Sequence, residues 1–127
     1  MTQEDKQLLL IDLCNRLPWG VNGKVETIDA NGKKIEDEGV CNSVFIDEFN
    51  TKYICIEGAE YELDDFKPYL RPMSDMTEDE EMELEETLQY TQYTLESYGW
   101  LNKKHFDYRG LIPKGLAIKA SKEMYNF

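Results

Sequence analysis

Residues 21–34 read VNGKVETIDANGKK, and along this segment small or β-branched residues alternate with polar ones. A period of two is the pattern of a strand that is buried on one face. The Asn31-Gly32 pair near the end is a strong hairpin signal, because both residues tolerate the positive φ angles of a tight turn. The segment therefore predicts two antiparallel strands that meet at the Asn-Gly pair.

Further strands are expected on the C-terminal side of this hairpin. Residues 40–46 and 52–56 are rich in β-branched and aromatic side chains, and the turn-like sequence DEFN separates them at positions 47–50. Gly58 allows a bend, after which residues 60–63 add a fifth short strand. Four or five short strands with tight turns predict a small antiparallel sheet or an SH3-like barrel.

The N-terminal side of the hairpin predicts a helix over residues 2–17. Thr2 is placed to cap this helix, Asp5 follows at the spacing of a capping box, and Pro18 ends it. Helical spacing predicts an apolar stripe that packs on the rest of the domain. The members of this stripe are Leu10, Leu13, Cys14 and Leu17.

Residues 64–72, DDFKPYLRP, predict a single helical turn followed by an extended exit, because each proline disfavours helical angles in the residue before it. We expect this segment to link a β half, residues 19–72, to an α half, residues 74–127. The large side chains expected to plug one end of the sheet are Phe66, Tyr69 and Leu70.

The α half opens with the clearest helix-start signal in the chain. Thr77 is followed by Glu80 at the capping-box distance, and four consecutive acids lie at the positive end of the helix dipole. We expect this helix to continue to about Tyr98, before a glycine that ends it. The alternative is a helix that stops near Leu88 and a strand over residues 89–94, since QYTQYT favours strands. The expected inner seam consists of Leu84, Leu88, Thr91 and Leu95.

A further short helix over residues 100–106 is expected to bury Trp100, Leu101 and Phe106. The predicted fold class is therefore α+β, with an N-terminal helix, a small antiparallel sheet or barrel, an acidic helix and a short helical C-terminal segment. A chain of 127 residues fits one domain, residues 1–127, which buries roughly two-thirds of the surface of its unfolded form.

Charge is distributed unevenly along the chain. The net charge is −12 at pH 7, and residues 72–102 carry nine Asp or Glu and no Lys or Arg. Such a segment is repelled by nucleic-acid backbones and anionic membranes, because phosphate binding needs clustered Lys and Arg. Only the last 25 residues, with six Lys or Arg against two Asp or Glu, have a basic excess.

The sequence also indicates a cellular setting. No apolar run approaches the roughly 18 to 20 residues of a membrane helix, and the first residues are acidic where a signal peptide would be basic. We therefore expect a cytoplasmic protein with no membrane partner. Cys14, Cys41 and Cys55 lack CxxC spacing, which favours reduced, packed thiols over disulfides or a zinc site.

Residues 105–117, HFDYRGLIPKGLA, hold the only histidine of the chain. His105 and Asp107 are the one acid–base pair on offer, but a lone histidine is more often structural, and no Ser or Cys lies in a nucleophile motif. Gly110 and Gly115 match no phosphate-binding loop, and the acids near Thr77 lack the spacing of a calcium loop. We predict no catalytic residue, no cofactor and no metal site.

Several segments together form a fingerprint that covers most of the chain. They are PYLRPMS (68–74), MTE (76–78), WLN (100–102), HFDYRGLI (105–112), KGLA (114–117) and MYN (124–126). This fingerprint resembles a family of small uncharacterised proteins from phages, prophages and genomes of gut Bacteroidales bacteria. The resemblance implies a bacterial or phage cytoplasmic setting and a mobile-element context. It brings no activity, cofactor or catalytic residue to this chain.

Two functional hypotheses follow. In the first, the protein is a non-catalytic interaction module that binds a host or phage protein through the acidic helix face of residues 78–86. In the second, the basic C-terminal segment contacts nucleic acid, with aromatic rings stacking on bases and Lys103 and Lys104 neutralising phosphate. Oligomeric state stays open. The candidate interaction residues are Glu78, Glu81, Glu85, Trp100, His105, Tyr108 and Arg109.

Arg109 has two alternative roles at this stage. A structural role would pair its guanidinium with Asp107 or with an acid of the long helix. A functional role would make it an interface anchor, because Arg, Tyr and Trp dominate binding hot spots.

Overall fold

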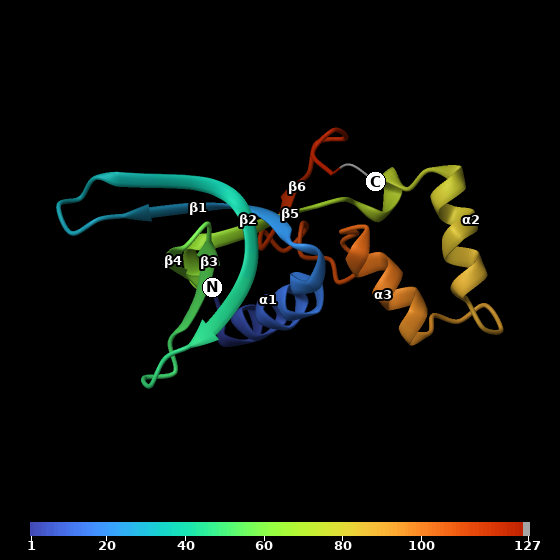
Figure 1. The fold of residues 1–127 in the computed structure, drawn as a ribbon, viewed down its shortest axis with the longest axis horizontal. Coiled ribbons are helices and arrows are strands. Elements are labelled where there is room, and N and C mark those ends of the chain that lie inside the picture. Colours follow the sequence, from blue (N-terminus) through green and yellow to red (C-terminus); the bar gives the residue numbers. More distant parts are fainter. Residues whose placement is uncertain (126–127) are drawn as a thin grey trace.

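The structure is a computed structural model that describes residues 1–125. Asn126, the last residue of the fingerprint, and Phe127 lie outside the described residues. The elements in chain order are α1 (Gln3–Arg16), η1 (Leu17–Trp19), β1 (Val21–Ile28), β2 (Lys34–Ile46), β3 (Lys52–Ile56), β4 (Ala59–Glu62), η2 (Leu63–Asp65), β5 (Phe66–Leu70), η3 (Met73–Asp75), α2 (Glu78–Thr87), α3 (Leu95–Lys103) and β6 (Ile118–Lys119). Figure 1 shows the β1–β2 hairpin tip and α2 at opposite ends of the molecule.

The strands form one six-stranded sheet in the order β4-β3-β2-β1-β5-β6. All neighbouring pairs are antiparallel except β5 and β6, which run parallel. The two outer strands, β4 and β6, do not pair with each other among the described residues, so the sheet is open rather than a barrel. The predicted α+β fold class is confirmed.

The predicted hairpin turn lies between β1 and β2. Gly32 has a φ of 80°, a conformation that glycine adopts without strain. The Oδ1 atom of Asp29 accepts hydrogen bonds of 2.9 Å from the backbone N–H groups of Asn31 and Lys33. The β2–β3 hairpin and the short strand after Gly58 are likewise present where the sequence predicts them.

The expected end plug at residues 66–70 is instead a strand, β5, in the interior of the sheet. Its burial alternates along FKPYL, and it pairs with β1 so that Pro68 lies opposite Gly23. A Cβ atom at Gly23 would overlap the ring of Phe66, so only glycine lets the two strands approach in this register. The prolines obscured this strand in the sequence, although Pro is tolerated where the partner needs no N–H donor.

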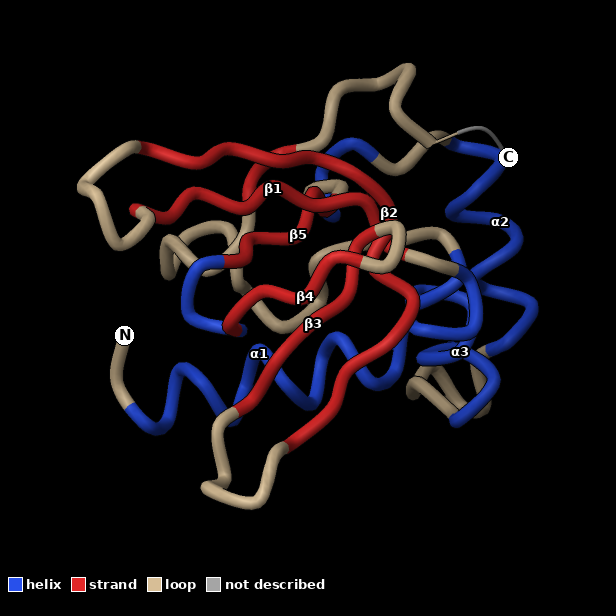
Figure 2. The backbone as a smooth tube through the Cα atoms, turned by 60° about the vertical axis from the view of Figure 1, so that its left-hand side comes forward, coloured by secondary structure: helices blue, strands red, loops and turns tan. Residues whose placement is uncertain are grey.

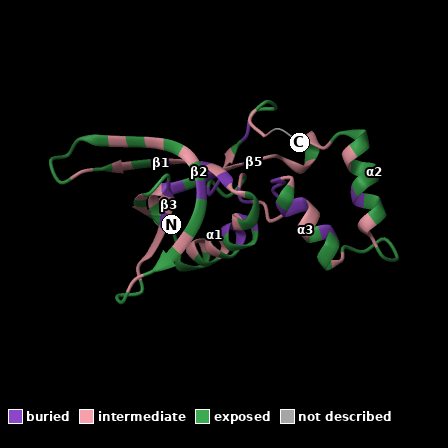
Figure 3. Ribbon diagram, viewed as in Figure 1, coloured by how far each residue is buried: buried purple, intermediate pink, exposed green. Residues whose placement is uncertain are grey.

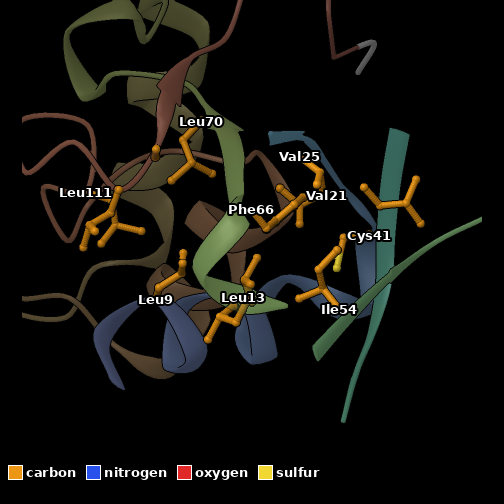
Figure 4. Close-up of a cluster of buried hydrophobic side chains, with 13 residues drawn as sticks. Leu9, Leu13, Val21, Val25, Cys41, Ile54, Phe66, Leu70 and Leu111 are labelled. Carbon is orange, nitrogen blue, oxygen red and sulfur yellow. The ribbon is translucent and has the colours of Figure 1, made fainter. Parts of the chain in front are cut away.

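Helix α1 covers one face of the sheet, as Figure 2 shows. Its capping box between Thr2 and Asp5 is confirmed. The predicted stripe is confirmed in part, because Leu13 is buried and Leu10 and Leu17 pack against the core, but Cys14 is exposed. The buried face also includes Leu9 and the charged residues Asp12 and Arg16, which are fully buried. Figure 4 shows the core between helix and sheet, which consists of Leu9, Leu13, Val21, Val25, Cys41, Ile54, Ile56, Leu63, Phe66, Leu70, Leu111, Leu116 and Ala117.

The expected continuous helix to Tyr98 is wrong. Helix α2 ends at Thr87, and Tyr90 and Thr91 have positive φ angles of 53° and 65°, which a helix cannot include. The alternative end near Leu88 matches, but residues 89–94 form no strand, only an isolated bridge between Gln89 and Gln92. The inner seam predicted for this helix is wrong at its C-terminal end, because Thr91 and Leu95 are exposed, Leu95 by 92%.

A second helix start follows at Thr94, which forms a capping box with Ser97 at the beginning of α3. Side-chain hydrogen bonds link this start to the end of α2: the Oγ1 of Thr94 donates to the carbonyl of Thr87, 2.9 Å away. The glycine expected to end the helix, Gly99, lies inside α3. The two helices therefore form a hairpin rather than one rod.

The helical hairpin has its own small core of Leu84, Leu101 and Phe106. Arg71, at the end of β5, forms two hydrogen bonds of 2.8 Å with the carboxylate of Glu80, and its guanidinium lies 4.2 Å from the centre of the Phe106 ring. The hydrogen bond from Arg71 is the main reason that the pKa of Glu80 is lowered. This contact fixes α2 to the sheet.

Within residues 1–125 no helix combines the length and the apolar content needed to cross a membrane. The three cysteines are free thiols. Cys41 is packed in the core as expected, and burial raises its pKa to about 11. Cys55 is half-buried, whereas Cys14 is exposed, which corrects the prediction of packed thiols at all three positions.

Candidate functional site

A buried charge network joins the first helix to the C-terminal segment. Arg16 donates hydrogen bonds to both carboxylate oxygens of Asp12, at 2.8 and 3.0 Å, and another of 2.6 Å to the carbonyl of Phe106. Arg109 donates to the Oδ1 of the same carboxylate at 2.8 Å. The side chains of Asp12 and Arg16 are fully buried, while that of Arg109 is 19% exposed. The network thus leads from the interior to the surface at Arg109.

This Arg109 contact corrects the structural pairing considered for it, because its partner is neither Asp107 nor an acid of α2. Its guanidinium also lies 4.6 Å from the centre of the Tyr108 ring, a favourable cation–π geometry. The hydroxyl of Tyr108 in turn donates to the Oδ1 of Asn102 at 2.8 Å. Both predicted residues are therefore held in place by neighbours from α1 and α3.

An open groove of about 700 Å³ lies next to these two residues. Its walls come from the end of α1, from η1, from the start of α3 and from the segment after α3. The residues that line it are Asn15, Trp19, Tyr93, Leu95, Tyr98, Gly99, Asn102, Tyr108 and Arg109. We call this feature the aromatic groove.

The aromatic groove displays apolar side chains that the core does not use. Trp19 is 44% exposed, and Leu95 is almost fully exposed. Tyr98 contacts two other rings, that of Tyr93 edge-on at 5.5 Å and that of Tyr108 at 5.4 Å between centroids. Single exposed apolar residues are ordinary, but a cluster of aromatic residues around a groove marks a binding surface.

The remaining predicted residues lie elsewhere. Glu78, Glu81 and Glu85 are exposed and spaced along one strip of α2, whose surface is largely solvent-facing in Figure 3. Trp100 is half-buried, with its ring stacked on Phe106 at 5.8 Å and its Nε1 donating to Glu83 at 3.1 Å. Neither the acidic strip nor Trp100 lines the aromatic groove.

His105 and Asp107 do not form an acid–base pair. His105 is only 3% exposed and stacks on the ring of Tyr125 at 4.2 Å, and its φ of 60° is left-handed. Burial, with the nearby Arg16 and Arg71 guanidinium groups, lowers the pKa of His105 to about 4. The carboxylate of Asp107 instead accepts hydrogen bonds from the backbone N–H groups of Leu111 and Ile112, at 2.8 and 2.9 Å. Both residues shape the chain after α3.

Of the nine residues that line the aromatic groove, the sequence predicted only Tyr108 and Arg109 as interaction residues. Tyr93, Leu95 and Tyr98 were assigned to one continuous helix, and Trp19 was read only as the start of the β half. One signal was available for the missed helix start, because Thr94 is a good N-cap residue that precedes a helix-forming run. Comparisons of the chain with protein-family models, with curated proteins and with solved structures find no significant match.

The chemical groups of the groove are of kinds that serve in recognition. Its lining offers aromatic and aliphatic surface, two side-chain amides and one partly neutralised guanidinium, with no nucleophile next to a base. Among residues 1–125, no group of three or more His, Cys, Asp or Glu is arranged to hold a metal ion.

Proposed function

We propose that this chain is a non-catalytic protein-interaction module that binds a partner protein through the aromatic groove, with the acidic strip of α2 as a second contact. The observation that supports this most is the combination of Trp19, Tyr98, Tyr108 and Arg109 around one groove. Trp, Tyr and Arg are the residue types that supply most of the binding energy at protein interfaces.

Part of the groove is held in place before a partner binds, which lowers the ordering cost of binding. Tyr108 and Arg109 are fixed by hydrogen bonds to Asn102 and Asp12. Rings that are already in place lose little side-chain freedom when a partner covers them, so more of the contact energy appears as affinity. A partner that fills the groove would bury the exposed surfaces of Trp19 and Leu95.

The acidic strip gives the partner an expected charge. Residues 72–102 carry nine acids and no base, and Glu78, Glu81 and Glu85 are all exposed. Such a surface accelerates association with a basic partner and disfavours acidic ones. A host or phage protein with a basic nucleic-acid-binding surface fits this description. The phage or prophage setting of the proposal comes from the resemblance alone.

The nucleic-acid alternative has less support. Arg109 shares the single carboxylate of Asp12 with Arg16, so its charge is only partly compensated, and Trp100 stacks on a core ring instead of offering a free face. The sequence hypothesis used Arg109 and Trp100 together with Tyr108, Lys103 and Lys104, of which Lys103 is exposed.

Affinity capture from bacterial lysate tests the proposal, with and without nuclease treatment. We expect a stoichiometric protein that survives nuclease and is lost with the groove variant Trp19→Ala/Tyr98→Ala. The matched control is Phe49→Ala, since Phe49 is 81% exposed at the β2–β3 turn, far from the groove. Equal capture by wild type and groove variant would refute the proposal.

The acidic strip is tested in the same assay with Glu81→Lys/Glu85→Lys. A control with the same change of net charge is Glu48→Lys/Glu60→Lys, at exposed positions in the β2–β3 turn and on β4. We expect only the first pair to weaken capture. Loss of all captured protein after nuclease treatment would favour the nucleic-acid alternative.

A further inference from the structure

We propose that the occupant of the aromatic groove is an extended, proline-containing segment in the polyproline II conformation, with Lys or Arg at the end that lies near Leu95. This inference rests on the proposed function and specifies the chemistry of the partner. Three features of the groove carry it: the nature of its walls, its hydrogen-bond donors and the charges around it.

The walls favour a ligand with flat apolar rings. Tyr93, Tyr98, Tyr108 and Trp19 bring four aromatic side chains to one groove, and Leu95 adds aliphatic surface. Proline rings are rigid and pack face-on against aromatic side chains, and a polyproline II segment is already extended before it binds. Its binding therefore costs less conformational entropy than the binding of a flexible chain.

The donors favour a ligand whose backbone carbonyls have no partner of their own. In the described part of the chain, the hydroxyls of Tyr93 and Tyr98 and the indole N–H of Trp19 have no protein hydrogen-bond partner. By contrast, the indole of Trp100 is bonded to Glu83. A polyproline II backbone forms no internal hydrogen bonds, so its carbonyls accept from such donors.

Two other binding modes fit less well. A helical ligand satisfies its own carbonyls internally, so it would leave these three donors unused. A strand that extends the sheet needs an exposed strand edge. The groove offers none, because no residue of β1 to β6 lines it. The extended segment is the mode that uses both the rings and the donors.

The surrounding charges set the expected orientation. Glu96 is exposed next to Leu95, and the loop at this end leads to α2 with its acidic strip. Arg109 is the one charged residue that lines the groove, and because it shares the carboxylate of Asp12 with Arg16, it disfavours a second positive charge beside it. A basic residue of the ligand is therefore favoured at the Leu95 end.

The test uses a synthetic peptide with a run of prolines and a terminal pair of arginines, titrated into the ¹⁵N-labelled full-length protein. We expect the indole N–H resonance of Trp19 to shift, while that of Trp100 stays in place. A peptide of glycine and serine with the same arginine pair is the control for charge. A helix-forming peptide of alanine and leucine with the same arginine pair is the control for conformation.

Variants separate the rings from the donors. Trp19→Ala and Tyr98→Ala are each expected to weaken binding of the proline peptide by about tenfold. Tyr98→Phe keeps the ring and removes the hydroxyl, so it should weaken binding by only about a few-fold. Glu96→Lys should weaken the arginine-bearing peptide more than a peptide of prolines alone. Phe49→Ala should change nothing.

The outcomes distinguish this inference from the proposed function. Saturable shifts at Trp19 with the proline peptide only would support the inference. If Trp19→Ala abolishes capture of the cellular partner but the proline peptide shifts nothing, the interaction function stands and the inference falls. Equal shifts with the glycine-serine peptide, or stronger binding of the helical peptide, would also overturn it.

Discussion

Asp12 is a residue at which a change of nearly constant shape should lower the free energy of unfolding strongly. The change Asp12→Asn keeps the side-chain size but removes the charge that balances Arg16 in the interior. Asp12 accepts three hydrogen bonds of 2.8 to 3.0 Å from guanidinium groups, two of them from Arg16, which is fully buried. Removing one partner of a buried ion pair costs about 3 to 5 kcal/mol, because the other charge stays buried without compensation.

The expected loss is a large part of the total stability of a domain, about 5 to 15 kcal/mol. Urea unfolding, monitored by tryptophan fluorescence, measures this loss. We expect a lower midpoint, with an unchanged dependence of the unfolding free energy on urea concentration. The control is Asp64→Asn, since Asp64 pairs with Lys6 at 2.9 Å on the surface, where such pairs contribute about 0 to 1 kcal/mol. A loss at Asp12 no larger than that at Asp64 would refute the reasoning.

Three further predictions concern the histidine, the glycines and the cysteines. The pKa of His105 is about 4, below its unfolded value near 6.5. Its neutral form therefore stabilises the fold fully above about pH 6.5, and up to about 3 kcal/mol is lost as the pH falls toward 4. The control is His105→Asn, because asparagine tolerates the left-handed backbone. In urea unfolding across this pH range, the variant should not show this acid-induced loss of stability. If the stabilities of wild type and variant fell in parallel with pH, the prediction would be contradicted. Gly23→Ala should destabilise by about 1 to 3 kcal/mol because its Cβ would overlap Phe66, whereas Gly99→Ala should stabilise α3 by about 0.5 to 1 kcal/mol, since a Cβ there meets open space. Equal unfolding midpoints for the two variants would show that the β1–β5 contact is not tight. A thiol reagent should label Cys14 in the native protein but reach buried Cys41 only after unfolding, and fast native labelling of Cys41 would contradict its burial.

The features that could be predicted from sequence are those determined by nearby residues. The capping boxes at Thr2 and Thr77 and the hairpin at Asn31-Gly32 each depend on side chains within four positions, and all three are present. The break after Thr87 was predicted only as the alternative to a continuous helix, because helix and strand propensities compete in QYTQYT. The structure resolves this competition with a tight turn, in which Tyr90 and Thr91 adopt positive φ angles.

The features that escaped prediction depend on residues far apart in the chain. Strand β5 forms because the edge of β1 and the gap at Gly23 accept Phe66 and Pro68. Buried Asp12 accepts a hydrogen bond from Arg109, which lies 97 positions further along the chain. The aromatic groove combines η1, the start of α3 and the segment after α3, so no single stretch of sequence reveals it. Tyr108 and Arg109 were predicted as interaction residues from their type alone.

Several contacts of the N-terminal part of the chain are made with residues that the ribosome adds last. Hydrogen bonds join Arg16 to Phe106, Asp12 to Arg109 and Asn22 to Tyr125, across 90, 97 and 103 positions. At about 5 to 20 residues per second, a ribosome needs about 5 to 20 s to make the intervening chain. Throughout this interval the nascent α1 carries the Asp12–Arg16 pair without the Phe106 carbonyl and the Arg109 guanidinium that complete its hydrogen bonds. We expect a chain that stalls before residue 105 to remain unfolded around α1 and to be degraded by cellular proteases.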